Sequence, residues 1–119
     1  MQSHTQHMLK GRSACMGTAT GRPRVIRKPH DLDEVAVGDI LVASETDISY
    51  VPAMQRAAAV ITETGGRFCH AAVWARENRK PTVLQAENAT NLLIGVSLVM
   101  VNASTGTIEW EQYREPESA

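Results

Sequence analysis

The stretch Gly65-Gly66-Arg67-Phe68-Cys69-His70 decides the fold of this chain. An apolar run over residues 58–62 precedes it and predicts a short buried strand, and the run over residues 71–77 that follows is typical of a helix. A strand, a glycine loop and a helix with a histidine in its first turn form a layout for holding an anion, because free backbone N–H groups and the helix dipole favour negative charge there. A phosphoryl group on His70 would lie in that field.

Composition limits the chain to one small domain. It has 119 residues, of which 43% are hydrophobic and only 4% aromatic, so the core must be mainly aliphatic. The net charge of −1 argues against nucleic-acid binding as the main function. Basic residues cluster within 10–28 and acidic ones within 31–47. This predicts either two solvated faces or a basic strand near a phosphate path or a partner subunit.

The cysteine pattern excludes a structural zinc site. Cys15 and Cys69 are the only cysteines, and they form no CxxC pair. We therefore expect no metal site, free thiols and a cytoplasmic location. No apolar run reaches the length of a membrane span or has the pattern of a signal peptide, so neither a membrane nor a nucleic acid is expected as a partner.

Hydrophobic periodicity and turn residues predict alternating strands and helices. We expect strands at residues 22–26, 40–43, 59–62, 82–84, 97–101 and 107–110, and helices within residues 47–58, 69–80 and 88–93. Short turns favour antiparallel pairing, while the intervening helices favour parallel crossovers. The pattern therefore indicates an α/β fold, with a mixed sheet flanked by two or three helices.

The block from Gly65 to Glu77 resembles the phosphohistidine domain of phosphoenolpyruvate-utilising enzymes. The resemblance extends from about Leu9 to Trp110. Cys69 directly before the histidine, with Glu77 further on, makes it most similar to the branch of phosphoenolpyruvate synthase and pyruvate phosphate dikinase. It implies a swivelling β/β/α domain at residues 9–110, and we expect a disordered leader at 1–8 and a charged, frayed tail at 111–119.

The same resemblance implies a role in phosphoryl transfer. In that family an ATP-grasp domain charges the histidine and a barrel domain exchanges the group with phosphoenolpyruvate or pyruvate. A barrel alone needs about 250 residues, so this chain has room only for the carrier. We expect no cofactor in this domain, and Mg²⁺ with ATP or phosphoenolpyruvate in an ATP-grasp or barrel partner.

The resemblance assigns the phosphorylated position to His70, whose neutral imidazole is a competent nucleophile. We assign phosphate-binding roles to Gly65, Gly66, Arg67 and Cys69. The two glycines would let the backbone approach a phosphate at positive φ, although a plain tight turn also explains them. Arg67 is either a partner of a phosphate oxygen or a solvent-exposed arginine.

Two aromatic residues depart from the family pattern. Phe68 stands where relatives usually have threonine, and we expect it on an exposed rim near His70, as a partner-docking residue. Trp74 shares a helix face with His70, so it either adds to a partner surface or fills the core. Arg76 lies off that face, and we expect it to form a structural ion pair.

Three functions remain open at this point. The first is the phosphoryl-carrier component of a multi-component phosphotransferase, with no complete turnover alone. The second is a non-catalytic docking module that keeps the fold. The third is an excised central domain of a longer phosphotransferase. The intact His70 and its double glycine favour a carrier over a docking module.

Overall fold

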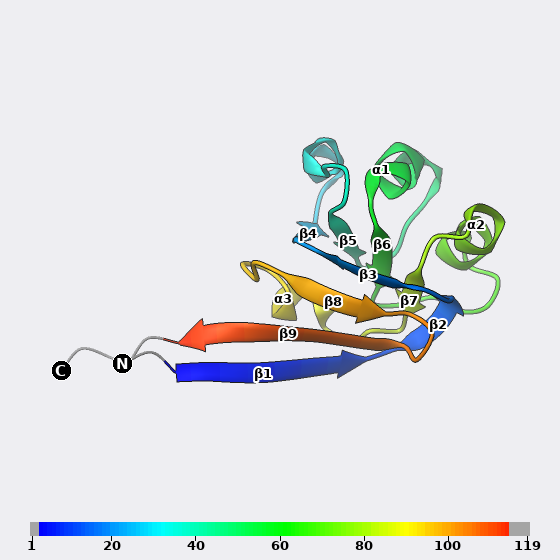
Figure 1. Ribbon diagram of the computed structural model, residues 1–119. Helices are drawn as coiled ribbons and strands as arrows, with labels where there is room; N and C mark the ends of the chain where they lie inside the picture. The colour runs from blue at the N-terminus through cyan, green and yellow to red at the C-terminus, as the bar shows by residue number, and fades with distance from the viewer. Residues whose placement is uncertain (1–2, 115–119) are drawn as a thin grey trace.

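The computed structural model describes residues 3–114, and the side chains of residues 6–111. The described chain forms three layers (Figure 1): a four-stranded antiparallel sheet, a five-stranded mixed sheet and a layer of helices. The first sheet has the order β1 (Ser3–Lys10), β9 (Thr107–Arg114), β8 (Val99–Asn102), β3 (Thr18–Gly21). The second has the order β2 (Arg12–Cys15), β7 (Thr82–Leu84), β6 (Ala59–Thr62), β5 (Ile40–Ala43), β4 (Pro23–Ile26). The β/β/α class is confirmed, but two sheets replace the single sheet that periodicity predicts.

Short helices connect these strands. They are the 3-10 helices η1 (Pro29–Glu34) and η2 (Ile48–Tyr50) and the α-helices α1 (Val51–Arg56), α2 (His70–Asn78) and α3 (Ala89–Leu92). Strands β4, β5, β6 and β7 run parallel, as the helical crossovers predict, while β2 pairs antiparallel with β7 at the edge. The expected single helix within 47–58 is divided into η2 and α1, because Pro52 has no N–H to continue the hydrogen-bond ladder and fits only the first turn of α1.

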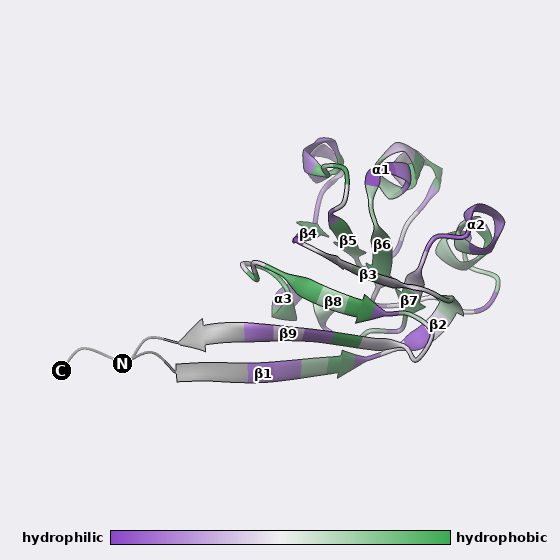
Figure 2. Cartoon of the chain, viewed as in Figure 1, coloured by the Kyte–Doolittle hydropathy of each residue, from purple (hydrophilic) through white to green (hydrophobic). Residues whose placement is uncertain are grey.

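The central strands separate two hydrophobic cores. Every residue of β5 and β6 is buried, which explains their continuous apolar runs. Ile40 and Val42 point into the core between the sheets, whereas Leu41 and Ala43 point into the core beneath the helices. In Figure 2 these central strands are green, for hydrophobic residues, whereas the helices contain both hydrophilic and hydrophobic residues. A sheet packed on both faces thus positions the loops that follow its strands.

The prediction of a disordered leader at residues 1–8 is wrong for residues 3–8. They belong to β1, which pairs antiparallel with β9 along its full length, from Ser3 opposite Arg114 to Lys10 opposite Thr107. The ring of His7 stacks on Trp110 at 5.4 Å between centroids. Backbone pairing orders this polar segment, and no hydrophobic pattern marks it. Residues 111–114 of the expected frayed tail likewise belong to β9, while residues 1–2 and 115–119 lie outside the described part.

Candidate functional site

The glycine loop links the end of β6 to the start of α2. Gly65 has φ +107°, and a Cβ there would lie 2.8 Å from Cys69 Sγ, so only glycine fits. Gly66 has no such φ, and a Cβ there would have open space around it. The prediction of a positive φ is therefore confirmed for Gly65 and wrong for Gly66. Helix α2 then begins at His70 and ends at Asn78, before Pro81, as expected.

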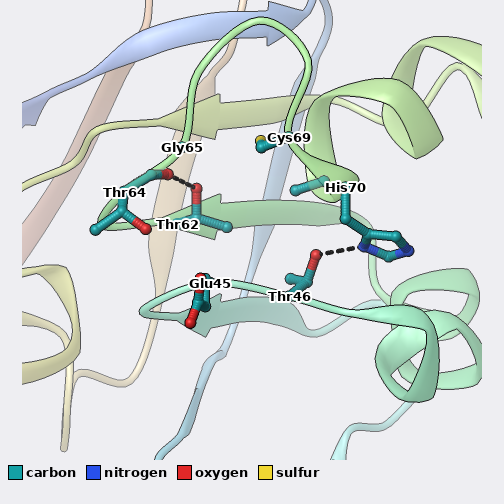
Figure 3. Close-up of a pocket in the computed structure, with 8 residues that line it drawn as sticks. Glu45, Thr46, Thr62, Thr64, Gly65, Cys69 and His70 are labelled. Carbon is teal, nitrogen blue, oxygen red and sulfur yellow. Dashed lines mark hydrogen bonds between the residues drawn. The ribbon is translucent and has the colours of Figure 1, made fainter.

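The imidazole of His70 is held by a residue from the segment that follows β5. Its Nδ1 lies 2.7 Å from the hydroxyl oxygen of Thr46, which follows β5 (Figure 3). Thr46 is not among the residues predicted for the site. A signal was nevertheless present: β5 and β6 are parallel neighbours, and ligands of such sheets bind beyond the carboxyl ends of the strands. The two residues therefore meet although they lie 24 positions apart.

A small cavity of about 100 Å³ opens beside the imidazole. The residues that line it come from the ends of β5 and β6 and from the start of α2: Glu45, Thr46, Thr62, Thr64, Gly65, Cys69, His70 and Ala71. One water needs about 10–15 Å³ on this measure, so the space admits a small polyatomic group. The Thr62 hydroxyl donates to the Thr64 carbonyl oxygen at 2.8 Å, which fixes the first turn of the loop.

The amides at the start of α2 are available to an anion. Helix geometry leaves the N–H groups of His70, Ala71 and Ala72 without an acceptor in the helix. The N–H of Cys69 is already used, because it donates to the Gly66 carbonyl oxygen at 3.0 Å. Cys69 itself is half-buried and packs against the core beneath the helices. Cys69 also lines the cavity, and its predicted role in phosphate binding stays a prediction.

Asp47 adds a negative charge near the imidazole. It caps η2, with the backbone N–H of Ser49 donating to its carboxylate at 2.8 Å. The pKa of Asp47 lies below its ordinary value, first because the Ser49 hydroxyl donates to the carboxylate and then because of this backbone bond. The nearby His70 ring contributes a smaller lowering of the same pKa.

The remaining predicted site residues lie outside the cavity. Phe68 is 82% exposed, which confirms its position on an open rim, and the guanidinium of Arg67 lies 5.6 Å from the centroid of its ring. Trp74 is half-buried against the core beneath the helices, which favours its packing role. Arg76 donates to the Arg67 carbonyl oxygen at 2.6 Å, but the expected ion pair is absent among the described residues.

Two further features concern the described residues only. None of the helices over residues 3–114 has the length and apolarity needed to cross a membrane. Within the same range, no three histidine, cysteine, aspartate or glutamate side chains gather in a group that could hold a metal ion.

The structure places a histidine at the start of a helix, behind a glycine loop, on a β/β/α fold. The chain belongs to the family of the mobile domain of PEP-utilising enzymes, whose model matches residues 35–106. In these enzymes the mobile domain carries the phosphohistidine. A relative described as a probable phosphoenolpyruvate synthase, from Methanothermobacter thermautotrophicus, is 42% identical over 101 residues. That match covers 85% of this chain but only 15% of the relative.

Solved structures share the fold. The aconitase X structure from Thermococcus kodakaraensis has a TM-score of 0.65 and 21% identity, and covers 87% of this chain and 98% of that one. A solution structure of Enzyme I has a TM-score of 0.54 and 24% identity, covering 65% of this chain and 32% of that one. At such low identities the likeness concerns architecture alone.

Proposed function

We propose that this chain is a cytoplasmic phosphoryl carrier in which His70 accepts a phosphoryl group and passes it on. The observation that carries the proposal is the held imidazole: Nδ1 is fixed by Thr46, while the ring borders a small cavity at the start of α2. The free amides of the first turn and the helix dipole favour the phosphorylated anion by about 0.3–2 kcal/mol. A structural histidine would need none of these features.

The hydrogen bond to Thr46 selects the attacking nitrogen. If Nδ1 carries the proton and donates it to the Thr46 oxygen, the lone pair of Nε2 is free to attack. The Nε2 lone pair then forms the N–P bond, the bond from phosphorus to the leaving oxygen breaks, and its electron pair remains on that oxygen. Nδ1 keeps its proton throughout, and the reverse displacement delivers the phosphoryl group to the acceptor.

Donor and acceptor belong to partner domains in this proposal. The family assignment and the small size of the cavity support an ATP-grasp partner, a phosphoenolpyruvate-binding barrel partner, or both, with Mg²⁺ held there. The chain spans 15% of the Methanothermobacter relative, which leaves room for such domains in the relative. The fold thus supplies a carrier, and the partners supply nucleotide or phosphoenolpyruvate binding.

The test compares charging of the wild-type chain with that of two variants. The protein is incubated with labelled ATP or labelled phosphoenolpyruvate and the nucleotide-binding and barrel parts of a phosphoenolpyruvate synthase, and the label is mapped by mass spectrometry. We expect an acid-labile, base-stable phosphoramidate on His70 and none in His70→Gln. The exposed His30 serves as the matched control, since His30→Gln should be charged like the wild type. Label that persists in His70→Gln would reject the proposal.

A further inference from the structure

A second cleft, of about 270 Å³, lies where β2 and α2 meet. It shares no lining residue with the cavity beside His70. Arginines dominate it, and they come from the start of β2, the glycine loop and α2; the full lining is Arg12, Ser13, Ala14, Arg67, Arg76 and Leu84. We call it the arginine cleft.

The charge of the arginine cleft is unbalanced. No acidic residue lines it, and among the described residues none of Arg12, Arg67 and Arg76 forms an ion pair. By contrast, the half-buried Arg24 pairs with both Glu34 and Asp39. Three positively charged side chains line one hollow, so an anion that enters it would reduce their mutual repulsion.

Local structure fixes the position of the elements that form the arginine cleft. Arg76 Nη2 donates to the Arg67 carbonyl oxygen at 2.6 Å, so two of the arginine-bearing elements are tied together. Strand β2 lies at the edge of the five-stranded sheet, and its register with β7 shifts between Ser13 and Cys15. Such bulges occur preferentially at sheet edges and beside sites, where they redirect side chains. The buried Leu84 provides an apolar part of the lining.

We propose that the arginine cleft binds the phosphate group of a small phosphorylated molecule, at a site separate from His70. Arginines supplied by three elements suit a tetrahedral anion with several oxygens better than a planar carboxylate with two. The Ser13 hydroxyl offers one further donor, and Leu84 can contact the carbon part of the ligand. A concave cleft fits a small ligand better than the broad, flat acidic surface of a partner protein.

The experiment titrates the whole chain with inorganic pyrophosphate at low salt and follows backbone amides by NMR. We expect saturable shifts at Arg12, Ser13, Arg67 and Arg76. Loss of one charge-assisted contact should weaken binding about tenfold or more in Arg12→Gln, and likewise in Arg76→Gln. Arg79→Gln is the matched control, because Arg79 is an exposed arginine that follows α2 and does not line the cleft.

Two further arms distinguish phosphate binding in the arginine cleft from binding at His70 and from a general attraction of acidic groups. The shifts at Arg12 and Arg76 should persist in His70→Ala, since the two cavities share no residue. A glutamate-rich peptide should bind more weakly than pyrophosphate. The proposal is overturned if pyrophosphate shifts only the residues around His70, if Arg79→Gln weakens binding as much as Arg12→Gln does, or if the peptide binds and pyrophosphate does not.

Discussion

Replacing Gly65 and Gly66 by alanine, one at a time, tests how the loop before His70 is built. The two glycines are adjacent in sequence, but their surroundings differ. At Gly65 the backbone has φ +107°, and a Cβ would lie 2.8 Å from Cys69 Sγ and 3.4 Å from Cys69 Cβ. At Gly66 a Cβ would have no atom within 4 Å. The same chemical change should therefore destabilise the protein at one position only.

The expected magnitudes follow from these two contacts. A non-glycine residue at such a φ costs on the order of 1–3 kcal/mol, and overpacking against Cys69 adds about 1 kcal/mol. Gly65→Ala should therefore lower the free energy of unfolding by about 2–4 kcal/mol, or roughly 8–16 °C in Tm for a chain of this size. Gly66→Ala should leave stability unchanged or raise it by up to about 1 kcal/mol, because alanine has less entropy to lose on folding.

Urea and thermal unfolding measure both variants, and a double variant separates the two costs. Cys69→Ala removes the Sγ that alanine at position 65 would meet, but it leaves the strained φ. Gly65→Ala combined with Cys69→Ala should recover only the overpacking part, which appears as a coupling free energy between the two substitutions. The reasoning fails if Gly66→Ala costs as much as Gly65→Ala, or if Gly65→Ala unfolds within about 0.5 kcal/mol of the wild type.

Three further substitutions probe the site. Thr46→Val keeps the side-chain shape but removes the bond to His70 Nδ1, so the rate of His70 phosphorylation should fall about tenfold in a labelling time course, and an unchanged rate would refute a positioning role. Phe68→Thr should change the free energy of unfolding by less than about 1 kcal/mol, and it should weaken phosphoryl transfer from the partner more than it weakens folding. A loss of roughly 3–5 kcal/mol in the free energy of unfolding would instead place Phe68 in the core. The pKa of Asp47 lies below its ordinary value of 3.8, so the contribution of its carboxylate to stability is fully present above pH 3.8 and is lost as the pH falls below that value. The Tm of Asp47→Ala should therefore drop less than that of the wild type between about pH 5 and about pH 3, and an equal drop would contradict the assignment.

The central part of the fold could be predicted from the sequence because its signals are local. Strands β5 and β6 are buried on both faces, so each has a continuous apolar run. The start of α2 follows from the glycine loop, and its end from Pro81, since the residue before proline resists the helical conformation. The exposure of Phe68 followed from the same loop geometry. These features depend on neighbours within a few residues.

The parts that escaped prediction depend on distant partners. Strand β1 is polar, and its order comes from pairing with β9 at the opposite end of the chain. The division into two sheets is likewise a matter of which strands pair, which periodicity does not contain. Thr46 reaches His70 only because β5 and β6 lie side by side, and the arginine cleft assembles from three separate elements.

The size of the His70 cavity bears on why a carrier would need partners. Sites that enclose a small-molecule ligand commonly measure about 300–1,000 Å³, whereas the space beside His70 is about 100 Å³. This space is large enough for a phosphoryl group and small for a nucleotide, which supports the proposal that another domain binds the rest of the donor. His70 is half-buried beyond the carboxyl ends of β5 and β6, and in the proposed function a donor and later an acceptor must reach it. The aconitase X structure shares the architecture, so the arrangement of strands does not identify a function, and the proposed carrier role rests on the histidine, the glycine loop and Thr46.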